Sequence, residues 1–176
     1  MCLAAAIALV IGVSVSAMAA DPGGASNVAL QEAIRQSRSA TPELGWARFQ
    51  RLQSDYPGLP ARTIAILQQR LKTQPADADG WFQLGLLQVV SGAPSEAAAS
   101  FAKAAQLRPI DPYGYAYQGY ALVEAGNPQA AMAPLQAALK RDPQHRFATW
   151  VLGQAYYRQG MRHQAAKVLL PAAHHP

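Results

Sequence analysis

Apolar residues recur at helical spacing in the stretch 60–72, where Ile64, Leu67 and Leu71 fall on one face. Such a stripe is typical of an amphipathic helix packed against a neighbour. The stretch WFQLGLLQVVSG, which begins at Trp81, differs because it is apolar on every face and contains two glycines. A glycine inside a lone helix costs about 1 kcal/mol relative to alanine. We therefore expect this helix to lie among others whose packing requires the glycines.

This pattern repeats every 34 residues, and the segments 78–111, 112–145 and 146–176 come into register without gaps. Each segment contains five matching positions in the same order: a glycine, a second glycine, an alanine, a large apolar residue and another alanine. The aligned sets are Gly85, Gly119 and Gly153; Gly92, Gly126 and Gly160; Ala97, Ala131 and Ala165; Phe101, Leu135 and Leu169; Ala104, Ala138 and Ala172. Each segment is therefore expected to form the same structural unit.

Two antiparallel helices are predicted for each unit. The first glycine of a unit lies at the contact between the helices and lets them approach closely, while the second makes the turn between them. Pro94 and Pro128 open the second helices, where a missing N–H costs nothing. Pro134 and Pro171 fall inside second helices. We expect a bend at each of these two prolines, on the outer, solvent-facing layer.

The repeat resembles the tetratricopeptide repeat (TPR), whose pattern is W-x2-L-G-x2-Y, then A-x3-F, then P. The first unit carries it in Trp81, Leu84, Gly85, Ala97, Phe101 and Pro109, while Tyr115 and Thr149 replace the tryptophan in the later units. The resemblance implies an all-α fold, a right-handed superhelical α-solenoid of three TPR helix-turn-helix units with N-terminal capping helices.

The region before the repeats is expected to form a helical cap over residues 27–77. Thr41, Pro42 and Glu43 are typical of a helix start, and they predict a helix over 41–56 in addition to the one at 60–72 and another near 27–37. Residues 21–26 are the expected linker.

Residues 1–20 hold no charged side chain, and Ala17 and Ala19 supply the small residues that signal peptidase reads. The segment is therefore either a signal peptide or a transmembrane segment. Both alternatives predict a periplasmic protein, exported or anchored to the inner membrane, that meets the membrane only through this segment.

Charge and composition exclude several kinds of function. The net charge is +5, and the basic residues are scattered singly, which argues against binding of nucleic acid. The single cysteine, Cys2, lies in the leader and excludes an intrachain disulfide. The four histidines show no metal-ligand spacing, and no catalytic motif is present. We therefore expect no metal, no cofactor and no enzymatic activity.

A TPR array makes its binding groove from the face of the first helices that points away from the paired helix. This face is apolar and aromatic here, which suits an amphipathic helix or an extended peptide. For any single member the alternative is a place in the core, under the cap or a neighbouring helix. The predicted groove residues are Phe82, Leu86, Val89, Tyr113, Ala116, Tyr120, Val123, Phe147, Trp150, Gln154, Tyr157 and Arg158.

TPR proteins that bind the acidic C-terminal tails of chaperones resemble one another in a clamp of Lys and Asn for the terminal carboxylate. The corresponding positions in this chain hold no such residue, and Arg158 is the one cation that we assign to the groove. The clamp positions are occupied by Phe82, Leu86, Tyr117, Phe147 and Val151.

The segment LQQRLKTQPADADGWFQLG, residues 67–85, is similar to the segment that joins a helix to the first TPR in the CcmI/CycH family. The members of that family are apocytochrome c chaperones of cytochrome c maturation. The resemblance implies a non-catalytic protein that holds an apocytochrome c, chiefly its C-terminal helix, while cytochrome c maturation proteins attach haem. The alternative is a general periplasmic TPR scaffold for assembly of an envelope or secretion complex.

Overall fold

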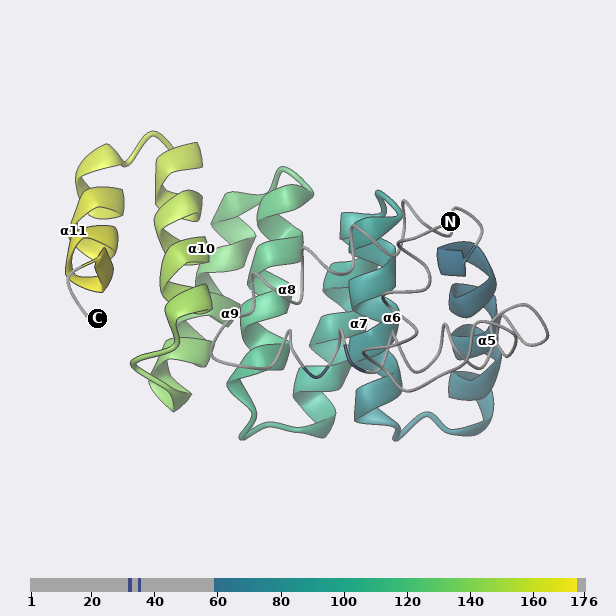
Figure 1. The fold of residues 1–176 in the computed structure, drawn as a ribbon. Helices are drawn as coiled ribbons and strands as arrows, with labels where there is room; N and C mark the ends of the chain where they lie inside the picture. The colour runs from purple at the N-terminus through teal and green to yellow at the C-terminus, as the bar shows by residue number, and fades with distance from the viewer. Residues whose placement is uncertain (1–31, 33–34, 36–58, 174–176) are drawn as a thin grey trace, which may run out of the picture. The chain divides into compact units, whose positions relative to one another are not determined.

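The computed structural model describes residues 32, 35 and 59–173 of the 176-residue chain. The helices of residues 59–173 are α5 (Leu59–Thr73), α6 (Ala78–Val90), α7 (Pro94–Leu107), α8 (Pro112–Glu124), α9 (Pro128–Arg141), α10 (Arg146–Arg158) and α11 (Arg162–Ala173) (Figure 1). No strand occurs in this range. The leader, the linker and the helix expected over 41–56 lie outside the described residues. In the helix expected near 27–37 only Glu32 and Arg35 are described; both are helical and form an ion pair.

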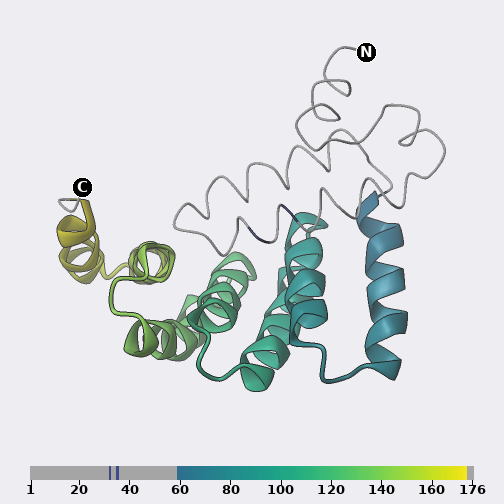
Figure 2. The same cartoon turned by 60° about the horizontal axis from the view of Figure 1, so that its bottom comes forward.

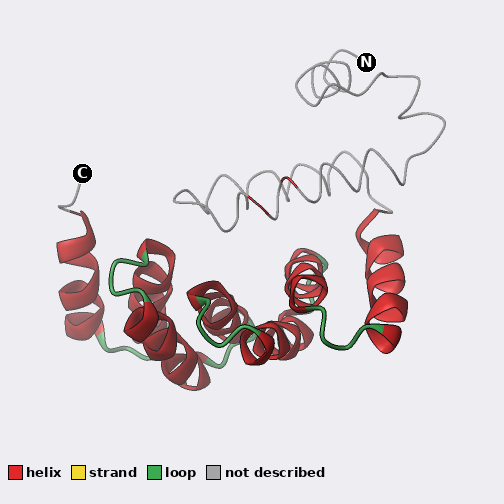
Figure 3. Ribbon diagram, turned by 90° about the horizontal axis from the view of Figure 1, so that it is seen from below, coloured by secondary structure: helices red, strands yellow, loops and turns green. Residues whose placement is uncertain are grey.

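Consecutive helices from α6 onward pack in pairs, α6 with α7, α8 with α9, and α10 with α11. The pairs are joined because α7 packs on α8, and α10 packs on both α8 and α9. Figure 2, coloured by residue number, shows α5 to α11 following one another in chain order along the array, and Figure 3 shows the helices in red with the connecting loops in green. The prediction of an all-α solenoid is confirmed, and α5 is the helix that precedes the first pair.

The turn inside each pair depends on a glycine in the left-handed region of the backbone. Gly92, Gly126 and Gly160 have φ of 78°, 79° and 77°. A Cβ added at any of them would meet nothing within 4 Å, so space is not what excludes another residue. The backbone conformation itself requires glycine, because an L side chain is strained at these angles.

The glycines inside the first helices serve a different purpose. A Cβ at Gly85 would lie 2.8 Å from the Phe101 ring, and one at Gly153 would lie 2.5 Å from the Leu169 side chain. The large residue of the second helix therefore occupies the space that the glycine leaves. Gly114 lies at a contact between units instead, where a Cβ would be 3.0 Å from the Ala105 backbone of α7.

Pro134 lies inside α9, which runs unbroken from Pro128 to Arg141. Its side chain is buried, so the expectation that it faces solvent is wrong. The physical reason is helical spacing, because Pro134 shares a face with the buried residues Ala131 and Ala138. Pro171 lies inside α11, near its C-terminal end.

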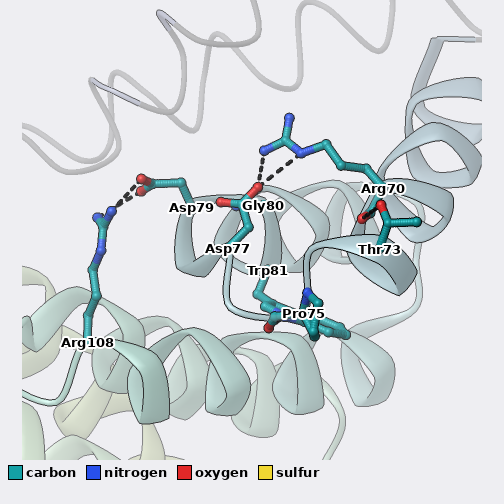
Figure 4. Close-up of polar contacts among 8 residues, drawn as sticks. All are labelled: Arg70, Thr73, Pro75, Asp77, Asp79, Gly80, Trp81 and Arg108. Carbon is teal, nitrogen blue, oxygen red and sulfur yellow. Dashed lines mark hydrogen bonds and ion pairs between the residues drawn. The ribbon is translucent and has the colours of Figure 1, made fainter.

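Polar contacts fix the junction between α5 and α6 (Figure 4). Asp77 caps α6 by accepting a hydrogen bond from the Gly80 amide at 2.9 Å, and it forms an ion pair with Arg70 of α5. Trp81 donates its indole N–H to the Pro75 carbonyl at 2.9 Å. Burial alone would raise the pKa of Asp77, but hydrogen bonds from Arg70 and Gly80 outweigh it and lower that pKa.

Candidate binding surface

Aromatic rings of α8 and α10 form a continuous row. The Tyr117 ring of α8 lies 4.7 Å from the Phe147 ring of α10, measured between centroids. Phe147 lies 5.6 Å from Tyr120 and 5.9 Å from Trp150, and Tyr120 stacks on Trp150 at 6.4 Å. We call these four residues the ring row. Aromatic pairs at these separations stabilise a protein by more than their buried area alone would, which favours a fixed arrangement of the rings.

The ring row runs from the core to the surface. At its inner end, Tyr117 lies 5.1 Å from the Phe82 ring and 5.4 Å from the Phe101 ring, and all three side chains are buried. At its outer end, Trp150 is 44% exposed. The outer end is therefore a ring that is supported from below and open to a partner above.

Tyr157 extends this exposed surface along α10. It is 64% exposed and lies seven residues after Trp150, which is two helical turns, so both rings share one face of the helix. Gln154, which is half-buried, lies between them on the same face. We call Trp150, Gln154 and Tyr157 the α10 face.

Four of the twelve predicted groove residues are fully buried, namely Phe82, Leu86, Ala116 and Val123. A place for them on an open groove is therefore wrong. Phe82 packs on the rings of Phe101 and Tyr117, while Ala116 and Val123 belong to the core cluster that α9 and α10 complete. The reason is that a first helix packs on the next unit as well as on its own partner.

The remaining predicted residues keep some exposed surface. Val89, Tyr113, Tyr120 and Phe147 are half-buried, and Tyr120 and Phe147 are members of the ring row. Tyr113 instead lies against the His145 ring at 4.6 Å. The structure thus brings together the aromatic residues that were predicted on α8 and α10.

Arg158 has structural partners and is no free groove cation. Its Nη1 donates to the Val123 carbonyl at 2.9 Å, and its Nη2 pairs with Glu124 at 2.8 Å. The last carbonyls of a helix lack partners within the helix, and at the end of α8 Arg158 adds a donor to the Val123 carbonyl, which also accepts from the Gly126 amide at 3.1 Å. The one cation that we assigned to the groove is therefore paired at the end of α8, which lies within reach of its guanidinium.

The ring row carries no charge near neutral pH. Burial raises the pKa of Tyr120 to about 12, and the nearby Glu124 carboxylate adds to this while Arg158 opposes it. The Tyr120 phenol therefore stays protonated at any physiological pH. A partner of this surface meets aromatic faces and a neutral hydroxyl.

His145 has a role that the sequence analysis missed. It caps α10, and its Nδ1 accepts a hydrogen bond from the Ala148 amide at 3.3 Å. The signal was present in the repeat, because His145 stands 34 residues after Asp111, which in turn stands 34 residues after Asp77. Both aspartates also cap first helices, Asp77 by accepting from the Gly80 amide and Asp111 by accepting from the Tyr113 amide.

Two further features bear on the kind of site. Within the described part of the chain, no three His, Cys, Asp or Glu side chains gather in a group that could hold a metal ion. In that same part, no helix combines the length and apolar character needed to cross a membrane.

Comparison with known proteins identifies the repeats. The family model described as tetratricopeptide repeat matches residues 58–114 and 118–169, more than half of the chain. No match was found among proteins of curated function.

Solved structures of MamA share the fold. A crystal structure of MamA protein superposes with a TM-score of 0.62 at 19% identity, covering 88% of this chain and 87% of that chain. MamA MSR-1 in form C2 gives a TM-score of 0.60 at 17% identity, covering 84% of this chain and 91% of that chain. Identity at this level shows a common fold and nothing more specific.

Proposed function

Because the chain belongs to the tetratricopeptide repeat family, we propose that it is a non-catalytic protein-binding module that holds an apocytochrome c helix during cytochrome c maturation. TPR arrays present extended surfaces to protein partners. The observation that carries the proposal is the α10 face, where Trp150 and Tyr157 are exposed above the buried part of the ring row.

The spacing on the α10 face fits a helical partner. Seven residues of helix correspond to about 10 Å, so the two exposed rings are separated by two turns. An amphipathic helix presents apolar anchors at the same interval on its own surface. Rigid aromatic rings offer contact area at a small cost in conformational entropy, which favours them as anchors.

Charge on the surface supports the same class of ligand. The carboxylate clamp of other TPR proteins is replaced by apolar and aromatic residues, four of which are buried, namely Phe82, Leu86, Tyr117 and Val151. Arg158 is paired with Glu124. A partner recognised here is therefore held by apolar contact along a helix and not by its terminal carboxylate.

The cytochrome part of the proposal rests on the resemblance of residues 67–85 to the CcmI/CycH family. In the structure these residues form the second half of α5, the capped junction and the start of α6. We infer that residues 1–20 direct the repeats to the periplasm, where cytochrome c is matured. The competing function is a general periplasmic scaffold for assembly of an envelope or secretion complex.

A binding titration separates the two functions. The full chain is titrated with a synthetic peptide of a cytochrome c C-terminal helix and, as control, with the same residues in scrambled order. The chaperone function predicts saturable binding of the helical peptide and none of the scrambled one. A chain that binds neither peptide at millimolar concentration contradicts the cytochrome proposal, and it leaves the scaffold as the function to be pursued.

A further inference from the structure

The three first helices of the repeat units are capped by equivalent residues of different chemistry. Asp77 accepts from the Gly80 amide, Asp111 accepts from the Tyr113 amide, and His145 accepts from the Ala148 amide. A carboxylate cap persists over the whole range near neutral pH. An imidazole cap does not, because histidine is the side chain whose ordinary pKa lies near 6.5.

The hydrogen bond at His145 defines its protonation state. Nδ1 accepts the Ala148 N–H, so it carries no proton, and the proton of the neutral ring is assigned to Nε2. The residue is 5% exposed, and Nε2 is a buried polar atom with no hydrogen-bond partner. A second proton would have to enter at Nδ1, where it would face the Ala148 N–H as donor against donor.

Protonation also conflicts with the surroundings of the ring. The N-terminus of a helix carries a partial positive charge, so an imidazolium there is repelled. The groups around His145 are Tyr113 of α8, the carboxylates of Asp111 and Asp142, and its exposed neighbour Arg146. Burial lowers the pKa of His145, and the attraction of the two carboxylates for the charged form does not offset it.

We propose that His145 is a pH-sensitive cap that weakens the first turn of α10 on acidification and thereby regulates the ring row. When this turn opens, the imidazole reaches water and binds a proton with its ordinary affinity. Acidification below pH about 6.5 therefore favours the open form. Folded His145 binds protons less tightly than open His145. The stability that the cap gives to the first turn of α10 is therefore fully present above that pH and is lost as the pH falls.

The ring row responds because it is built on the turn that His145 caps. Phe147 follows the cap by two residues, and it contacts Tyr117, Tyr120 and Trp150. Tyr113 packs on the imidazole itself. Opening of this turn withdraws the ring that joins the buried part of the row to Trp150. As regulation of partner binding, this inference rests on the proposed function; as a conformational change it stands alone.

Amide hydrogen exchange of the full chain tests the conformational change. Exchange at Ala148 and Thr149 is compared at pH 7.5 and pH 5.0, after correction for the intrinsic effect of pH. The open population in the wild type should increase several-fold at pH 5.0, because the imidazole of the open form takes up a proton that the folded cap binds less tightly. In His145→Asn, which keeps a neutral cap, this increase should disappear. An equal increase in the variant overturns the proposal.

The control variant is His163→Asn, which removes an exposed histidine of α11 and should leave the increase unchanged. Binding of the cytochrome c peptide at the two pH values is then measured separately. Weaker binding at pH 5.0 in the wild type but not in His145→Asn supports regulation. If the peptide binds at neither pH, the proposed function fails. The exchange result still shows whether His145 acts as a pH-sensitive cap.

Discussion

Gly119 of α8 faces Leu135 of α9 so closely that a Cβ at Gly119 would lie 2.5 Å from the Leu135 Cγ. Leu135 is fully buried and belongs to the core cluster between the second and third pairs. The two residues stand at the equivalent positions to Gly85 with Phe101 and Gly153 with Leu169. One contact, repeated in each pair, therefore sets how closely its two helices pack.

Gly119→Ala should destabilise the protein by about 1–3 kcal/mol, because an added methyl group overpacks a buried contact. The change is measured as the free energy of unfolding in urea, followed by circular dichroism. Helix propensity acts in the opposite direction, since alanine is favoured over glycine by about 1 kcal/mol in a helix. A stabilising effect of Gly119→Ala would show that the contact is loose and that the proposed packing is wrong.

Gly126→Ala tests the turn of the second pair by a different mechanism. A Cβ there meets no atom within 4 Å, but φ is 79°. The strain of an L residue in this region predicts a loss of about 1–2 kcal/mol. Gly126→Asn is the matched variant, because asparagine tolerates positive φ better than alanine. Thermal unfolding should rank the wild type above Asn and Asn above Ala; equal losses for the two variants would not fit a conformational cause.

Asp77 should make the stability of the array depend on acidic pH. Its pKa in the folded chain is lowered from 3.8, so its contribution is present above pH about 4 and is lost as the pH falls through the folded pKa. Asp77→Asn keeps an amide oxygen for the Gly80 N–H but removes the ion pair with Arg70. Urea unfolding between pH 2.5 and pH 6 should show a smaller decrease for Asp77→Asn than for the wild type.

Asp79→Asn is the control for that experiment, since Asp79 pairs with Arg108 at a more exposed position. Exposed ion pairs contribute little, so its pH dependence should follow that of the wild type closely. If Asp79→Asn reduces the pH dependence of the unfolding free energy more than Asp77→Asn does, the α5–α6 junction is not the site that acid disrupts.

Arg158→Met should reduce stability by about 1 kcal/mol, because the Val123 carbonyl loses one of its donors, keeping the Gly126 amide, and Glu124 loses its ion pair. Methionine keeps much of the apolar stem, so packing changes little. Since Arg158 is a structural link between α10 and α8, affinity for a helical peptide should fall much less than after loss of an exposed ring. A large loss of affinity without loss of stability would indicate that Arg158 contacts the peptide directly.

Much of the fold followed from the sequence because the 34-residue period is carried by residues with strict local requirements. Gly92 needs a positive φ, and Gly85 needs the space beside Phe101. These requirements act within one helix pair, so a period in the sequence reveals them. The burial of Phe82 could not be read this way, because it depends on Tyr117 in the next unit.

The candidate surface was predicted less well, because the burial of its residues also depends on contacts between units. Position along a first helix placed Trp150 and Tyr157 on a face that is exposed. It could not show that α9 and α10 cover Val123, or that Arg158 reaches across to the end of α8. Contacts between units depend on how the pairs stack, which local spacing does not specify.

The central claim is that the α10 face binds a helical peptide, and Trp150→Ala combined with Tyr157→Ala tests it most directly. Both rings are exposed, so the fold should survive, as circular dichroism will show. Ile110→Ala is the control, because it removes an exposed apolar side chain from the turn between α7 and α8. By isothermal titration with the cytochrome c helix, we predict that the double variant loses at least tenfold in affinity while Ile110→Ala retains wild-type affinity. Unchanged affinity in a folded double variant would contradict the account.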